Sequence, residues 1–202
     1  MTELAQSYSG TGIPLRWRRS VATTILEPTA PHHESRAVED EMRGLVAAAR
    51  DISWSGDKAK SVAAREALIR GGSLSIPIVL QAVGVLPRPD VQDEAIVILR
   101  RIAEEGAASQ LMKFAVSPDL TPPARATVAR AIGVALLTSE LTTDALEALA
   151  SMLSDSSAEV RDAAVAALSD RGGEAKQVLQ TALETEKAEF VRAAIREAIE
   201  EC

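Results

Sequence analysis

The chain has 202 residues and a formal net charge of −7, which argues against general nucleic-acid binding because that function needs a basic footprint to neutralise phosphates. Hydrophobic residues make up 47 % of the chain but aromatic residues only 2 %, so the core must be built from Ala, Leu, Val and Ile. Because Ala loses no side-chain entropy in a helix, this composition predicts an all-α protein.

The sequence is typical of a protein from a reducing, aqueous compartment. Its single cysteine is Cys202, so no disulfide can form within the chain. Residues 1–12 lack the apolar core of a secretory signal, and no run of about 18 apolar residues suggests a membrane span. We therefore expect a cytoplasmic protein without a membrane partner.

Residues 1–35 form a predicted N-terminal arm that lacks the periodicity of the rest of the chain. The arm holds three of the nine prolines and many Ser and Thr residues, which is typical of a flexible tail. Within it, Trp17 is flanked by Arg16 and Arg18, and a tryptophan beside arginines is a common interface anchor. The arm is therefore either a loosely held tail or a peptide that packs on the helical region or on a partner.

From Arg36 onward, apolar residues recur at helical spacing, and turns rich in Gly, Pro and Asp separate the helices. Pro77 falls in the first turn of its helix, where the missing N–H costs nothing, and Asp90 is placed as the N-cap of another. Ten helices in five pairs are predicted, over about 36–49, 58–70, 76–86, 91–105, 107–116, 122–137, 142–153, 158–170, 175–183 and 188–201.

The second helix of each pair carries an internal repeat. One apolar position recurs at intervals of 31, 33, 36 and 31 residues, and irregular periods of this size are typical of stacked helix pairs with insertions in their turns. One turn earlier the residues are mostly small, which allows neighbouring helices to approach closely. The apolar series is Leu68, Leu99, Ile132, Leu168 and Ile199, and the earlier series is Ala64, Ala95, Val128, Ala164 and Ile195.

An acidic residue precedes an arginine by six positions in three successive repeats. These pairs are Asp119 and Arg125, Asp155 and Arg161, and Glu186 and Arg192. Together with the Val-Arg start of the second helix, the pattern resembles HEAT repeats and is similar to the Ala-rich repeats of phycobilin-lyase-type HEAT proteins. The resemblance is strongest over residues 106–202, since Ser61 and Gln92 replace the arginine in the first two pairs.

The resemblance implies a right-handed α-solenoid of about five HEAT-like helix pairs over residues 36–202, following the arm. It also implies that the acidic residues and arginines form a structural ladder between neighbouring repeats. The second helices would then line a concave face, where solenoids usually bind their partners. Residues expected to point outward on that face include Arg65, Ile69, Val97, Arg100, Arg130, Val165 and Arg196.

The arginines among these residues make the N-terminal half of the expected face more basic than the C-terminal half. Either this face is simply a solvated helix surface, or it is a groove for an acidic helix or peptide. Together with Arg16, Trp17 and Arg18 of the arm, we predict Arg65, Arg100, Arg130 and Arg196 as partner-binding residues.

No group of residues in the sequence is arranged for catalysis. The only histidines, His32 and His33, have no third metal ligand at a suitable spacing, and Cys202 is poorly placed for a nucleophile. We therefore predict a non-enzymatic module without a cofactor or metal. It would act as a scaffold, adaptor or regulatory subunit that binds a protein partner of unknown identity.

Two other classes of function stay open. A lyase-like or chaperone-like subunit that handles a tetrapyrrole or its acceptor protein is implied by the phycobilin-lyase likeness. A HEAT-like DNA-repair protein is the other, although it should have a basic concave face with aromatic residues and a catalytic acid. The acidic, aromatic-poor composition argues against this second class.

Overall fold

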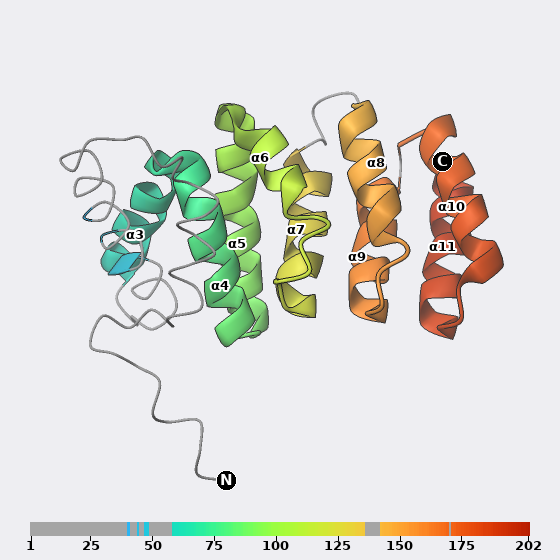
Figure 1. Cartoon of the computed structure of the whole chain (residues 1–202), viewed down its shortest axis with the longest axis horizontal. Coiled ribbons are helices and arrows are strands. Elements are labelled where there is room, and N and C mark those ends of the chain that lie inside the picture. Colours follow the sequence, from blue (N-terminus) through green and yellow to red (C-terminus); the bar gives the residue numbers. More distant parts are fainter. Residues whose placement is uncertain (1–39, 41–43, 45–46, 49–57, 136–141, 170) are drawn as a thin grey trace, which may run out of the picture. The chain divides into compact units, whose positions relative to one another are not determined.

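The structure, a computed structural model, describes residues 40, 44, 47–48, 58–135, 142–169 and 171–202. This part of the chain contains helices and no strands, which confirms the all-α prediction for it. The chain divides into two compact units, Met1–Gly44 and Leu45–Cys202, and the helices labelled in Figure 1 belong to the second. The predicted arm and most of the first predicted helix lie outside the described residues.

The helix boundaries follow local signals in the sequence. Pro89 begins α5, and the hydroxyl of Thr142 accepts a hydrogen bond from the Ala145 N–H at the start of α8 (3.3 Å). The helices are α3 (Lys58–Arg70), α4 (Ser75–Val85), α5 (Pro89–Ile102), α6 (Ala108–Lys113), α7 (Pro122–Ala135), α8 (Thr143–Met152), α9 (Ala158–Leu168), α10 (Gly173–Thr185) and α11 (Glu189–Glu201), with a 3-10 turn at Gly72–Leu74 and a π-helical segment at Ala103–Ala107.

The helices of the second unit stack in two rows. In the first row, α3 packs on α5, α5 on α7, α7 on α9, and α9 on α11, so the second helices of the repeats lie side by side (Figure 1). In the other row, α4, α6, α8 and α10 cover these helices from one side, each contacting the helix that follows it. This arrangement is that of an α-solenoid.

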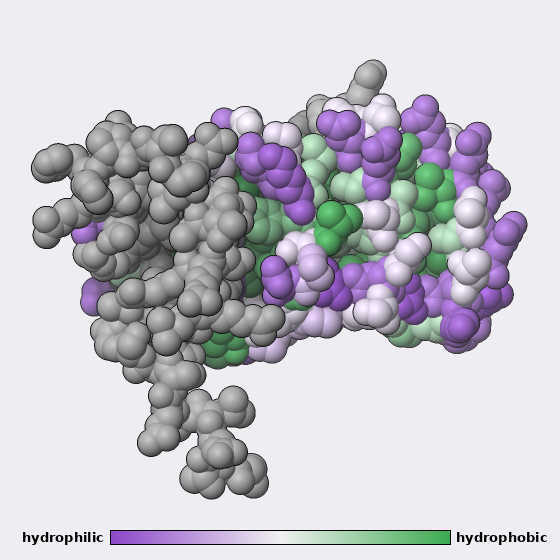
Figure 2. All heavy atoms as spheres, viewed as in Figure 1, coloured by the Kyte–Doolittle hydropathy of each residue, from purple (hydrophilic) through white to green (hydrophobic). Residues whose placement is uncertain are grey.

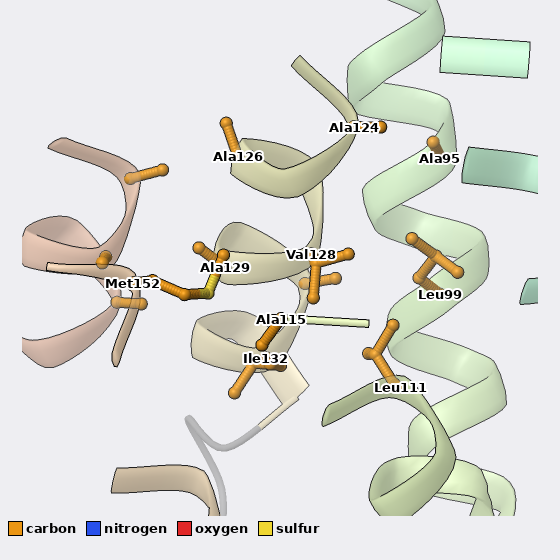
Figure 3. Close-up of a cluster of buried hydrophobic side chains, with 14 of the residues drawn as sticks. Ala95, Leu99, Leu111, Ala115, Ala124, Ala126, Val128, Ala129, Ile132 and Met152 are labelled. Carbon is orange, nitrogen blue, oxygen red and sulfur yellow. The ribbon is translucent and has the colours of Figure 1, made fainter. Parts of the chain in front are cut away.

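The repeated apolar positions form the core of the stack. Leu68, Leu99 and Leu168 are each no more than 1 % exposed, and the small residues one turn earlier are buried as well. Figure 3 shows Val128 of α7 directed toward Leu99 of α5, while Met152 of α8 reaches toward Ala129 on the other side of α7. Each helix of the row therefore packs against neighbours on more than one side.

Several predicted details are wrong. Ile69 and Val165 were expected on the outer face, but they are buried, at 4 % and 2 % exposure. Close packing buries six of the eleven residues of α9, and Ile69 of α3 belongs to the same hydrophobic core. Asp90 lies in the first turn of α5 instead of capping it, since Pro89 already begins the helix. The helix predicted over 107–116 is only six residues long, because the chain turns directly after Lys113.

Candidate interaction surface

One position on each helix of the first row stays at the surface, two residues before the repeated Leu or Ile. We call this series the exposed row. Since the helices pack side by side at about 8–10 Å, the row runs continuously from α3 to α11. The exposed row consists of Glu66, Val97, Arg130, Ala166 and Glu197, of which only Arg130 is half-buried.

The exposed row mixes charge with apolar surface. It contains acidic, apolar and basic residues, and its apolar member Val97 is 38 % exposed. The face of the molecule seen in Figure 2 has the same character over α7–α11, where hydrophilic side chains are interspersed with small hydrophobic areas. A surface of this kind suits a polar partner with a few apolar contacts.

The arginines predicted for partner binding in the N-terminal half are engaged within the chain. Arg65 forms a two-pronged hydrogen bond to Glu94, and its Nη2 lies 2.8 Å from Oε2. This hydrogen bond raises the pKa of the Arg65 guanidinium above its ordinary value. Arg100 Nε lies 3.6 Å from Glu104 Oε1, and Arg130 Nη1 donates to Gln92 Oε1 (3.2 Å).

The contacts with Glu94 and Glu104 lower the positive charge that the face presents to a partner. The Arg100 pair is about 39 % exposed on both sides and is therefore weak, so a partner carboxylate can compete for it. Arg196 of α11 is exposed and lies 3.5 Å from Glu189. Arg16, Trp17 and Arg18 lie outside the described residues.

Two arginine–carboxylate pairs link consecutive repeats, and we call them the arginine ladder. Arg125 of α7 donates through Nε and Nη2 to both oxygens of Asp155 (2.6 and 2.9 Å), while its Nη1 donates to the carbonyl oxygen of Leu120 (2.6 Å). Burial raises the pKa of Asp155, but hydrogen bonds from Arg125 and from the Ser157 N–H outweigh this effect and leave the pKa below its ordinary value.

The second pair of the arginine ladder repeats this geometry. Arg161 of α9 donates through Nε and Nη2 to Glu186 (2.6 and 2.8 Å), and its Nη1 donates to the carbonyl oxygen of Asp155 (2.9 Å). The hydrogen bond from Arg161 lowers the pKa of Glu186 to about 2, although its burial opposes the shift. N–H groups of Lys187 and Ala188 also donate to Glu186, at 2.7 Å each. The carboxylate thus shapes its own turn and binds the preceding repeat.

The remaining predicted ladder residues do not make such a pair. Asp119 is exposed, and the preceding repeat has Gln92 where an arginine would have to stand. Arg192 of α11 donates through Nη1 to the carbonyl oxygens of Leu183 (3.3 Å) and Glu186 (3.0 Å). The arginine ladder of the described chain therefore runs from Arg125 to Glu186.

Some surface features have no counterpart in the sequence-based predictions. Phe190 of α11 is 58 % exposed, and only its aromatic character in an aromatic-poor chain could have marked it. Glu94 as the partner of Arg65 could have been found only from the helix register, since the two residues lie 29 positions apart.

Neither a metal site nor a membrane span is evident in the described part of the chain. The described residues contain no group of three or more His, Cys, Asp or Glu residues placed to hold a metal ion. No single described helix has both the length and the apolar composition to cross a bilayer; only the pair 59–70 and 72–85, bent by 112°, meets those criteria together.

Comparison with known proteins identifies one family. Residues 116–200 match the family model for HEAT repeats, which covers the segment from the turn after α6 into α11 and includes both pairs of the arginine ladder. No curated protein matches the chain.

Proposed function

The chain is a HEAT-repeat protein, with its repeats matched over residues 116–200, and from this premise we propose that it is a non-enzymatic module that binds a protein partner. HEAT repeats generally mediate protein–protein interaction. Stacked helical repeats present extended surfaces built from equivalent positions of successive units, and such surfaces are where solenoids hold other proteins. Its role would be that of a scaffold, adaptor or regulatory subunit.

The observation that carries this proposal is the exposed row. It provides one surface side chain per repeat at a constant register, on helices that pack side by side. Arg100 and Arg130 lie beside or within the row, and their contacts with Glu104 and Gln92 are partly exposed. We propose that a helix or extended peptide of the partner lies along the row and competes for these arginines.

A charge reversal tests this placement. The full-length chain and an Arg100→Glu, Arg130→Glu variant are used to capture partners from native cytosol, and the affinity of the recovered partner is then measured for both. We expect the variant to keep its helical circular dichroism and to bind at least roughly tenfold more weakly, since each lost charged hydrogen bond contributes about 1.5–3 kcal/mol.

The matched control carries the same change of charge on the other row of helices. Lys113→Glu with Lys176→Glu alters α6 and α10 and should leave the affinity unchanged. Full binding by the Arg100/Arg130 variant would move the site away from the exposed row. In that case the arm is tested next, by replacing Arg16, Trp17 and Arg18 with Ala in the full-length chain.

Several finer features stay predictions from the sequence. The right-handed sense of the solenoid, its five helix pairs, the likeness to phycobilin-lyase-type repeats and the cytoplasmic location belong to this group. The tetrapyrrole-related and DNA-repair alternatives gain no support from the geometry described above.

A further inference from the structure

Arg192 occupies the position on α11 that Arg125 and Arg161 occupy on α7 and α9. In all three arginines, Nη1 is held by carbonyl oxygens of the preceding turn: Leu120 for Arg125, Asp155 and Ser156 for Arg161, and Leu183 and Glu186 for Arg192. The backbone therefore orients the Arg192 guanidinium in the same way as the two arginines of the ladder.

The outer edge of the guanidinium distinguishes Arg192 from the other two. In Arg125 and Arg161, Nε and Nη2 donate to one carboxylate of the next repeat. Within the described residues, Nε and Nη2 of Arg192 have no hydrogen-bond acceptor, and the nearest carboxylate is Glu189 at 3.7 Å from Nε. Consistent with an open edge, the Arg192 side chain is 32 % exposed, against 12 % and 17 % for the other two.

We propose that this outer edge of Arg192 binds a carboxylate of the partner protein, presented by an acidic turn. The proposal rests on the proposed function and adds the chemistry of one contact to it. An oriented guanidinium suits this role because its two parallel N–H groups match a carboxylate in geometry as well as in charge. The contact would repeat, between two proteins, what Asp155 and Glu186 do within this chain.

The surroundings of Arg192 favour a turn over another tightly stacked helix pair. At the register where α7 has the small residues Ala129 and Gly133, α11 carries the exposed residues Arg196 and Glu200. These long charged side chains prevent the close helix approach seen between α7 and α9. Among the described residues, Glu189 is the one carboxylate that competes for Arg192, and at 80 % exposure it can move into water when a better-placed carboxylate arrives.

The test uses a peptide that carries a single carboxylate in the right local setting. Residues 152–158 of this chain, Met-Leu-Ser-Asp-Ser-Ser-Ala, acetylated and amidated, contain the Asp155 turn and no other charge. The peptide is titrated into the full-length protein while the arginine Nε–Hε resonances are followed by NMR. We expect a saturable shift of the Arg192 resonance, and no such shift with the same peptide carrying Asn in place of Asp.

Two variants locate the effect. Arg192→Lys keeps the positive charge but loses the two parallel N–H groups of the guanidinium, so the protein should bind the peptide at least roughly tenfold more weakly. Arg196→Lys on the same helix should leave the affinity for the peptide unchanged. A peptide that leaves the Arg192 resonance unmoved, an equal shift with the Asn peptide, or equal binding by Arg192→Lys would each overturn the proposal.

The same variants separate this inference from the proposed function. A captured partner that binds wild type and Arg192→Lys equally well would overturn the role of Arg192 and leave the protein-binding module in place. If no partner is captured, the proposal that the chain is a protein-binding module is contradicted, and the peptide titration still decides whether Arg192 binds a carboxylate.

Discussion

At the scale of single residues, paired side chains in this protein differ mainly in burial. Arg161 and Glu186 are 17 % and 3 % exposed and bonded through two parallel hydrogen bonds, whereas Arg88 and Asp90 are both 62 % exposed. Exposed pairs contribute only about 0–1 kcal/mol, while removing one partner of a buried pair leaves an uncompensated charge. The arginine ladder is therefore where single polar substitutions should matter for stability.

Acid should destabilise the protein through Glu186. Its pKa is about 2 in the folded chain against an ordinary 4.5, so the carboxylate binds protons more weakly when folded than when unfolded. Its contribution to stability is thus fully present above pH 4.5 and is lost as the pH falls from there toward 2. Urea unfolding at a series of pH values measures this loss.

The matched variant is Glu186→Gln, which keeps the shape of the side chain and removes its titration. We expect this variant to be less stable than wild type at pH 7 and to lose less stability between pH 5 and 3. Parallel pH profiles for the two proteins would show that Glu186 does not carry the effect.

At the scale of helices, close approach decides which residues are tolerated. Gly133 of α7 faces Ala167 of α9 so closely that a Cβ added at Gly133 would lie 2.8 Å from the Ala167 Cβ and 2.9 Å from its Cα. The need at this position is for space, since the backbone of Gly133 has ordinary helical geometry. The two helices can be neighbours only because both residues are small.

A larger residue at this contact should force α7 and α9 apart. Gly133→Val is expected to lower the free energy of unfolding by about 1–3 kcal/mol through overpacking, as measured by chemical denaturation. Gly173 begins α10 with open space around it, so Gly173→Val is the control and should cost less. Adding Ala167→Gly to Gly133→Val should recover part of the loss; no recovery would contradict the contact as described.

At the scale of the whole second unit, stability should be distributed along the stack. Each helix of the first row contacts mainly its immediate neighbours, so unfolding can begin in one repeat without crossing the entire array. The C-terminal helices α9, α10 and α11 contact one another and join the rest through the packing of α9 on α7 and α8.

A buried charge in α9 should therefore unfold the C-terminal repeats selectively. Leu168 is fully buried, and its burial contributes roughly 1.5–3 kcal/mol, to which Leu168→Asp adds the cost of an unpaired carboxylate. We expect hydrogen exchange to accelerate over α9–α11 while α5 keeps more of its protection. Ala166→Asp, at an exposed position of the same helix, should exchange like wild type; unchanged melting of Leu168→Asp would show that the buried series is misplaced.

The sequence alone determined the class of the fold and the register of its core. Periodic Ala and Leu residues and proline- or glycine-containing turns are local signals, and they correctly placed Leu68, Leu99 and Leu168 in the interior. They also identified the HEAT repeats, because tandem copies reinforce a pattern that one copy would leave ambiguous.

Only the tertiary structure decided which of the remaining side chains are paired or buried and which are available to a partner. Arg65 and Glu94 lie 29 positions apart, and Arg130 and Gln92 lie 38 apart, so their pairing depends on how neighbouring repeats are aligned. Val165 appeared to face outward from α9 alone but is buried by helices on either side. The open edge of Arg192 likewise emerges only by comparison with Arg125 and Arg161 in three dimensions. The spacing of acid and arginine is the same in all three repeats, and only the stacking decides which arginine meets a carboxylate.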